Sequence, residues 1–230
     1  MAEPPALVAC SHGTRDLAGR QAVDDLRAAV ASARRGLRVV EAYVDVQQPE
    51  LSDVLDGLGP AVVVPVLLSS GYHVHVDITD AVAGAGPQVR VAAALGPHPA
   101  LVEVLAERLD GAAASPDHAV VLAAAGSSDR RAVSDVERTA SELAKRLGRP
   151  VLAAYASAAL PRVDEAVGQL QSAARPVAIA SYLLAPGFFY DQLATAGAEV
   201  VTAPLLPHPA ITALVLERYD EAASADGQLA

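Results

Sequence analysis

Residues Ala61 to Asp77, AVVVPVLLSSGYHVHVD, join an apolar run to a glycine turn and a pair of histidines. The apolar part, Ala61 to Leu68, is rich in β-branched residues and far too short to cross a membrane. Such a run is typical of a strand that is covered on both faces of a parallel sheet. Ligands of open α/β sheets bind beyond the carboxyl ends of the strands. His73 and His75 therefore lie at the sheet edge where a ligand-binding or catalytic site is expected.

A second strand with a histidine at its end lies near the start of the chain. The apolar run Ala6 to Cys10 is followed at once by Ser11, His12 and Gly13. Cys10 is the single cysteine, and we expect it to be a small core residue rather than a nucleophile. Because one cysteine cannot form an intramolecular disulfide, the sequence fits a reducing compartment.

The composition indicates an acidic globular protein. The 230 residues are 52% hydrophobic and 3% aromatic, with 27 acidic and 17 basic side chains and a net charge of −10. Binding to nucleic acids depends on basic residues and aromatic stacking, so no nucleic-acid partner is expected. No apolar run reaches the ~18 residues of a membrane helix, and the amino terminus lacks a secretory signal. We expect a cytoplasmic monomer or homodimer without a membrane partner.

Apolar runs alternate with helical periodicities along the first half of the chain. Strands are expected near residues 6–10, 37–44, 61–68 and 89–94. Helices are expected over 17–33, 49–58, 75–83 and 99–109. This alternation predicts a parallel sheet that is flanked by helices.

The same pattern then runs a second time. Pro97-His98-Pro99 returns as Pro207-His208-Pro209, and the other matches fall at offsets of roughly 110–116 residues. The recurrence of His98 indicates a structural role at the start of a helix. Strands are expected at 119–124, 151–155, 177–182 and 199–202, with long helices at 130–147 and 208–223. The fold class is therefore α/β, with two duplicated domains, each a parallel sheet of about four strands flanked by helices; we place them at 1–113 and 114–230.

Comparison of the two halves singles out a few polar residues. Glycines, prolines and an Ala-Tyr pair persist between the halves, whereas three polar positions change together. In the second half, Ala125 replaces His12, Ser157 replaces Asp45 and Phe189 replaces His73. If these residues were needed for folding, the second half would need them as well. We therefore expect one working site, carried by the first domain.

Two imidazoles and a carboxylate at one sheet edge suit a borderline divalent cation such as Fe²⁺, Co²⁺, Ni²⁺ or Zn²⁺. The thiolates of a closed structural zinc site are missing. A single histidine after a strand is commonly structural, but the loss of both from the second half favours function. His75 shares a face with His73 on a strand and not on a helix, so we expect only His12 and His73 to hold the metal.

Three motifs together resemble the class II chelatases, the sirohydrochlorin ferrochelatases and cobaltochelatases. They are SHGTRD at 11–16, GYHVHVDI at 71–78 and LGPHP at 95–99. The resemblance implies two chelatase-like domains facing each other across a cleft. It also implies a lyase that inserts Fe²⁺, or else Co²⁺, into sirohydrochlorin during sirohaem or cobalamin biosynthesis. His12 and His73 match the family's metal-handling histidines, and Asp45 stands where the family usually has a glutamate, so these three are the expected catalytic residues.

The resemblance implies a polycarboxylate substrate, which an acidic protein must meet with local donors. The expected substrate-binding residues are Ser11, Gly13, Thr14, Arg15, Ser69, Ser70 and Gly71. The divalent metal (Fe²⁺, Co²⁺ or Ni²⁺) is a substrate, and no organic cofactor is expected. A non-catalytic carrier of metal or tetrapyrrole that uses the same cleft is the alternative function. A metal-dependent hydrolase has less support, because neither an adjacent second carboxylate nor a Ser-His-Asp order is found.

Overall fold

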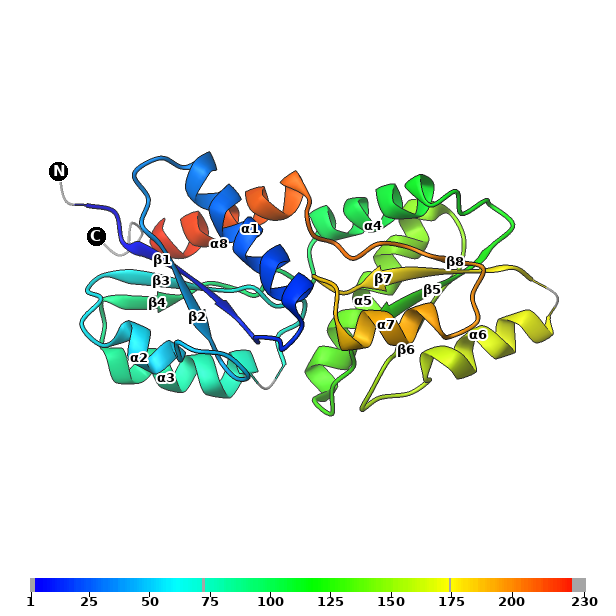
Figure 1. Cartoon of the computed structure of the whole chain (residues 1–230), viewed down its shortest axis with the longest axis horizontal. Coiled ribbons are helices and arrows are strands. Elements are labelled where there is room, and N and C mark those ends of the chain that lie inside the picture. Colours follow the sequence, from blue (N-terminus) through cyan, green and yellow to red (C-terminus); the bar gives the residue numbers. More distant parts are fainter. Residues whose placement is uncertain (1–2, 72, 174, 225–230) are drawn as a thin grey trace. The chain divides into compact units, whose positions relative to one another are not determined.

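The computed structural model describes residues 3–71, 73–173 and 175–224, and the side chains of residues 73–75 lie outside this description. The chain divides into two units (Figure 1). Unit 1 consists of residues 1–95 and 209–230, and unit 2 consists of residues 96–208. Each unit contains one four-stranded sheet in which every pairing is parallel, as the sequence predicts.

Unit 1 is a three-layered α/β structure with strand order β2-β1-β3-β4. Helices α1 and α8 cover one face of the sheet, and α2 and α3 cover the other (Figure 1). Its elements are β1 (Ala6–Ser11), α1 (Leu17–Ala33), β2 (Val39–Tyr43), α2 (Leu51–Leu55), β3 (Ala61–Pro65), η1 (His73–Ile78), α3 (Thr79–Ala85), β4 (Val89–Val91) and α8 (Pro209–Ser224).

The strand order places a topological switch point between β1 and β3. The chain leaves β1 for β2 on one side and later returns to β3 on the other side of β1. Pairing continues just beyond the strands, because the Val66 N–H donates to the Cys10 carbonyl (2.7 Å) and the Val44 N–H to that of Ser11 (3.1 Å). The segments that follow β1, β2 and β3 thus all start from one edge of the sheet, where open α/β sheets bind ligands.

Unit 2 repeats this architecture with strand order β6-β5-β7-β8. Helices α4 and α5 pack together, and α6 packs against β5, β6 and β7. Its elements are α4 (Pro99–Gly111), β5 (Ala119–Ala124), α5 (Arg130–Leu147), β6 (Val151–Tyr155), α6 (Val163–Ser172), β7 (Val177–Tyr182), α7 (Phe188–Ala194) and β8 (Val200–Val201).

The compact units are not the sequence repeats 1–113 and 114–230, because the repeats exchange their last helices. Helix α4 ends the first repeat but packs on α5 and β7 of unit 2, whereas α8 ends the second repeat and packs on α1, β3 and β4 of unit 1. In unit 1, the Tyr219 hydroxyl donates to the Pro5 carbonyl (2.7 Å), and Arg34 forms a two-point ion pair with Asp220. The division expected at 113/114 therefore follows the repeats rather than the packing.

The expected strands are all present, and two features differ from the expected helices. Helices α6 and α7 were not predicted. The helix expected from residue 75 begins instead at His73 as the π-helix η1, which leads directly into α3. The expected role of His98 is confirmed, since its Nδ1 accepts the Ala100 N–H (3.2 Å) at the start of α4. Across the described ranges, no helix is both long and apolar enough to cross a bilayer.

Candidate functional site

His12 follows β1 directly and is half-buried at the switch point of unit 1. The next residue, Gly13, has φ +90°, a left-handed conformation that glycine adopts without steric cost. A Cβ atom at this position would lie 2.8 Å from the backbone oxygen of Asp45 and 3.3 Å from the Cβ of Gln47. Only glycine therefore allows the turn after β1 to pack against the loop after β2. This contact brings the backbones that carry His12 and Asp45 together, as expected from the shared sheet edge.

Asp45 lies in a tight turn at the end of β2. Its Oδ1 accepts the N–H of Val46 (2.7 Å), and its carbonyl accepts the N–H of Gln47. Val46 has φ +53°, which β-branched residues rarely adopt. Asp45 is exposed, so its carboxylate lies at the protein surface next to the His12 turn.

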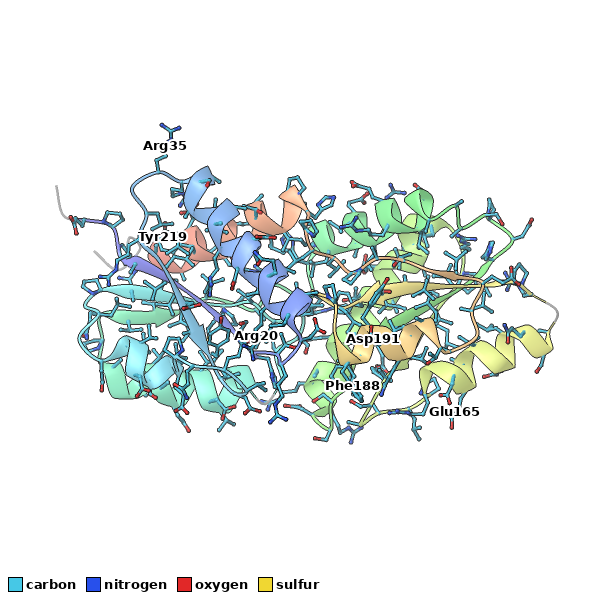
Figure 2. The ribbon with its side chains drawn as sticks, in the orientation of Figure 1. Arg20, Arg35, Glu165, Phe188, Asp191 and Tyr219 are labelled. Carbon is cyan, nitrogen blue, oxygen red and sulfur yellow. The ribbon has the colours of Figure 1, made fainter. Side chains whose placement is uncertain are left out.

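The backbone of Thr14 is held by side chains from two other segments. Its N–H donates to Oε1 of Gln47 (2.7 Å), and its carbonyl accepts from Nε of Arg20 (2.8 Å), which lies near the start of α1 (Figure 2). The Thr14 hydroxyl accepts the N–H of Asp16 (3.1 Å), and Asp16 caps α1 by accepting the Gly19 N–H (2.8 Å). The segment from His12 to α1 is thus fixed at several points.

The sequence interpretation did not single out Gln47 or Arg20. In the second repeat, Ala159 and Val133 stand at the matching positions. The differences between the two repeats therefore identify Gln47 and Arg20 as well as the candidate metal ligands.

Two of the expected substrate-binding residues are committed to the fold. Ser11 is the last residue of β1 and is buried, and its carbonyl accepts the Val44 N–H. The Thr14 N–H, which was expected to meet a substrate carboxylate, donates to Gln47. Arg15 is exposed, and the expected residues 69–71 are half-buried between β3 and η1.

The segment with His73 has an unusual backbone. Residues His73–Ile78 form a π-helix, a conformation that is rare and found frequently at functional sites. The side chains of His73 and His75 lie outside the described residues, so the expected meeting of His12 and His73 stays a prediction. Among the side chains that the structure describes, no three or more His, Cys, Asp or Glu residues form a group that could hold a metal ion.

Unit 2 builds the same loops without the candidate ligands. Gly126 matches Gly13 with φ +93°, and Ala158 matches Val46 with φ +57°. The Ser157 hydroxyl, at the position of Asp45, donates back to the Ala125 carbonyl (2.8 Å). Ala125, at the position of His12, offers only a methyl group. The loop framework is therefore independent of the groups that could bind a metal.

Two protonatable groups on the site strands are poor proton acceptors near neutral pH. Burial raises the pKa of the Cys10 thiol to about 12, and Cys10 is fully buried in β1, as the sequence predicts. Burial also raises the pKa of Tyr43 at the end of β2, where its hydroxyl contacts Glu41 (3.2 Å) and Arg27 (3.3 Å). Both groups therefore stay protonated near neutral pH.

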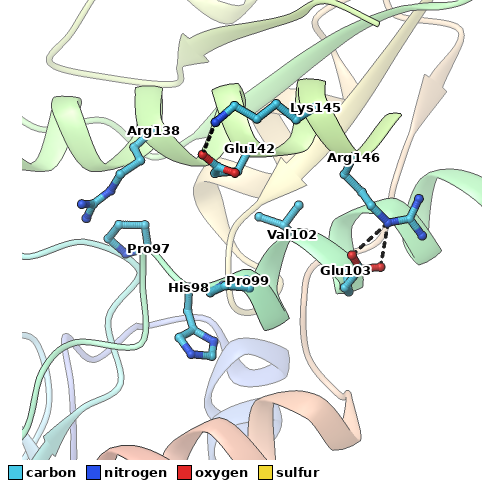
Figure 3. Close-up of a pocket in the computed structure, with 9 residues that line it drawn as sticks. All are labelled: Pro97, His98, Pro99, Val102, Glu103, Arg138, Glu142, Lys145 and Arg146. Atoms are coloured by element: carbon cyan, nitrogen blue, oxygen red, sulfur yellow. Dashed lines mark hydrogen bonds and ion pairs between the residues drawn. The ribbon is translucent and has the colours of Figure 1, made fainter. Parts of the chain in front are cut away.

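A pocket of about 560 Å³ lies in unit 2 (Figure 3). It is lined by Pro97, His98, Pro99, Val102, Glu103, Arg138, Glu142, Lys145 and Arg146. Its basic side chains pair with acidic neighbours: Lys145 with Glu142 (2.7 Å) and Arg146 with Glu103 (2.8 Å). The pocket contains none of the expected site residues. Its Arg146–Glu103 pair joins α5 to α4, and its Lys145–Glu142 pair lies within α5.

Comparison with known proteins gives a family match over both repeats. The family model described as CbiX matches residues 6–112 and 119–222. SirB from Bacillus subtilis with Fe³⁺ is 22% identical with a TM-score of 0.82, and 98% of each chain is covered. The sirohydrochlorin chelatase SirB from Bacillus subtilis subspecies spizizenii, in complex with cobalt, is 18% identical with a TM-score of 0.78 and the same coverage.

A third solved structure is CbiX, described as the terminal enzyme for siroheme biosynthesis in denitrifying bacteria. It is 19% identical with a TM-score of 0.69, and the match covers 94% of this chain and 99% of that one. A search of curated protein sequences finds no significant match. At these identities, the likeness to the solved structures establishes the fold.

Proposed function

Because the chain belongs to the CbiX family of class II chelatases, we propose that it inserts a divalent metal ion into sirohydrochlorin. The observation that carries this proposal is the contrast between two matching frameworks. Both units build the glycine turn and the tight loop, but only unit 1 adds His12 and Asp45 to them. The two loops lie at a switch point, and they carry an imidazole and a carboxylate in only one of the two units. This arrangement fits a site that binds a metal ion.

The proposed chemistry exchanges two pyrrole N–H protons for one divalent ion. The site must therefore hold a cation and accept protons. Neutral imidazole can do both, because its reference pKa of ~6.5 lies near physiological pH. We assign His12 and His73 to present the metal to the macrocycle and to accept the pyrrole protons. Asp45 assists by neutralising charge and by passing the protons that the imidazoles accept on to solvent at the surface beside the His12 turn.

Binding of the substrate needs local donors, because the whole chain is acidic. A polycarboxylate is repelled by a net charge of −10 unless N–H groups, hydroxyls or a guanidinium meet it directly. We assign this role to Gly13, Arg15 and the segment 69–71, together with the Thr14 hydroxyl. Ser11 is left out, since it is buried at the end of β1.

We propose Fe²⁺ as the inserted metal, with Co²⁺ as the alternative and Ni²⁺ as a third ion to be tested. The fold is shared with SirB structures that hold Fe³⁺ and cobalt, which supports the first two. The product then serves sirohaem or cobalamin biosynthesis in the cytoplasm. The reaction needs no organic cofactor, and we propose that the enzyme acts as a monomer or homodimer.

The proposal is tested by following the absorbance of sirohydrochlorin during anaerobic addition of Fe²⁺, Co²⁺ or Ni²⁺. The wild-type protein is compared with His12→Ala and His73→Ala, and with His208→Ala as a control histidine of unit 2, where it contacts Glu107 (3.0 Å). We expect wild type and the control to accelerate metallation, and the first two variants to lose at least roughly 100-fold in rate. No acceleration by wild type overturns the proposal. Stoichiometric binding of metal and macrocycle without acceleration indicates the alternative function of a carrier.

A further inference from the structure

We propose that Gln47 and Arg20 are positioning residues that orient His12 by holding the backbone of Thr14 from both sides. The role rests on the proposed function, because it assigns a purpose to His12. Thr14 lies two residues after His12, and its N–H and carbonyl are both engaged, by Gln47 at 2.7 Å and by Arg20 at 2.8 Å. A turn with fixed peptides on its far side fixes the direction in which the preceding side chain leaves the sheet.

The two holding side chains come from separate parts of unit 1. Gln47 belongs to the loop after β2 and lies directly against Gly13, whereas Arg20 belongs to the first turns of α1. The Arg20 N–H also donates to the Asp16 carbonyl (3.0 Å), which ties its backbone to the start of the helix. The contacts therefore link β1, the Asp45 loop and α1 around a single residue. A displacement of Thr14 relative to Gln47 or Arg20 breaks one of them.

Unit 2 shows that these contacts are not needed to build the turn. Its turn keeps the left-handed Gly126 and the bond from the Asp129 N–H to the Ser127 hydroxyl (3.0 Å). It nevertheless has Ala159 in place of Gln47 and Val133 in place of Arg20. Both holding residues thus occur in the unit that has the imidazole and are missing from the unit that has Ala125. Because both residues accompany the imidazole and unit 2 folds without them, we assign them to the orientation of His12 rather than to general support of the fold.

The test uses the intact protein and four single variants. Gln47→Ala and Arg20→Val reproduce the residues of unit 2, and Gln47→Glu keeps an acceptor at the same distance from the backbone. Gln171→Ala is the matched control, because the side-chain amide of Gln171 also binds the backbone of another segment: in unit 2, its Nε2 donates to the Gly197 carbonyl (2.8 Å). Co²⁺ binding is measured by visible absorption without the macrocycle, and the kcat and KM of metallation are measured separately.

We expect Gln47→Ala and Arg20→Val to weaken Co²⁺ binding and to lower kcat by about 10–100-fold, the usual effect of losing a group that orients a metal ligand. KM for sirohydrochlorin should change little. Gln47→Glu should bind Co²⁺ at least as tightly as wild type, since it keeps the acceptor and adds negative charge. Gln171→Ala should match wild type in every measurement. If Gln47→Ala does not fold, Gln47→Asn is used, because its amide is one methylene too short for the same bond.

A double variant shows whether Gln47 acts through His12. In the His12→Ala background, Gln47→Ala should cause no further loss of Co²⁺ binding, because its effect passes through the missing imidazole. A further loss, or folded Gln47→Ala or Arg20→Val proteins with wild-type binding and turnover, overturns the positioning role. If Co²⁺ binding depends on His12 and Gln47 as expected but wild type does not accelerate metallation, the positioning role stands and the proposed function fails.

Discussion

The two units share a loop framework and differ in the chemistry placed on it. Gly13 and Gly126 have φ values of +90° and +93°, and a Cβ on either would collide with a backbone oxygen, that of Asp45 or Ser157. Each unit also caps the following helix with an aspartate, Asp16 or Asp129. These features are required wherever the turn is built. They therefore explain the fold and carry no information about function.

The side chains at the ligand positions behave differently in the two copies. In unit 2, the Ser157 hydroxyl satisfies the Ala125 carbonyl within the loop (2.8 Å). In unit 1, Asp45 is exposed, and its Oδ1 accepts the N–H of the next residue, Val46 (2.7 Å). The polar side chain of the unit 2 loop is thus hydrogen-bonded within its own loop, whereas the unit 1 loop exposes a charged carboxylate at the surface. Comparison of the two repeats therefore distinguishes residues that both loops need for folding from residues that only the proposed site needs.

The largest expected effect comes from deleting residues 209–230, which include α8 (Pro209–Ser224). The deletion uncovers the part of one sheet face that α8 covers in unit 1, because α8 packs against α1, β3 and β4. We expect complete loss of metallation and of Co²⁺ binding, although α8 carries no proposed ligand. Circular dichroism should still show a cooperative transition from unit 2. Retention of Co²⁺ binding by the truncated protein would show that unit 1 does not depend on the exchanged helix.

The next effect compares the loop after β2, which carries Asp45, with the loop after β6, which carries Ser157. Asp45→Ala should slow metallation by roughly 100-fold through loss of a charged group beside His12, whereas Ser157→Ala should leave the rate unchanged. Asp45→Glu restores the residue usual in the family and should stay within about threefold of wild type. The rates come from the absorbance of sirohydrochlorin under saturating Fe²⁺ or Co²⁺. Equal rates for the two alanine variants would remove Asp45 from the site.

A smaller effect is expected from alanine at the two turn glycines. Gly13→Ala and Gly126→Ala each force a strained φ and a backbone clash, so each should lower the free energy of unfolding by about 1–3 kcal/mol. Only Gly13→Ala should also weaken Co²⁺ binding in the protein that remains folded. Denaturant titration and Co²⁺ titration provide the two measurements. Weaker Co²⁺ binding in Gly126→Ala would contradict the division of roles.

The smallest effect concerns the attachment of α8 to unit 1. The hydrogen bond from Arg34 holds the pKa of Asp220 below its ordinary value of 3.8. Because the folded pKa is lowered, the pair stabilises unit 1 above the ordinary pKa, and this contribution is lost as pH falls through the folded pKa. Asp220→Asn should therefore lower Tm slightly at pH 7 and by less near pH 3. A Tm difference that grows on acidification would contradict this pairing.

The sheets could be read from the sequence because their strands are short and mostly apolar. Runs such as Ala61–Pro65 and Val177–Tyr182 allow no other interpretation between helical segments. Helix α6 carried a usable signal as well, since Val163, Ala166 and Val167 are buried at helical spacing. Helix α7 begins instead with Phe188, Phe189 and Tyr190 and spans one short segment, so its periodicity is weak.

Other features depend on contacts that one sequence does not specify. The apolar faces of α4 and α8 predict that each helix packs on a sheet, but the two sheets are so alike that the pattern cannot assign a partner. Gln47 is neutral, and its importance follows from its 2.7 Å bond to a residue 33 positions away. The candidate ligands, by contrast, stood out because His12 and Asp45 directly follow strands and are replaced in the second repeat.

The central claim is that unit 1 alone handles the metal. Crystals of the wild-type protein soaked in Co²⁺ and measured at the cobalt absorption edge test it most directly. We predict one anomalous peak bonded to an imidazole nitrogen of His12, and its loss in crystals of His12→Ala. A peak bound by unit 2 at the Ala125–Ser157 loops, or one near His12 that persists in His12→Ala, would contradict the account.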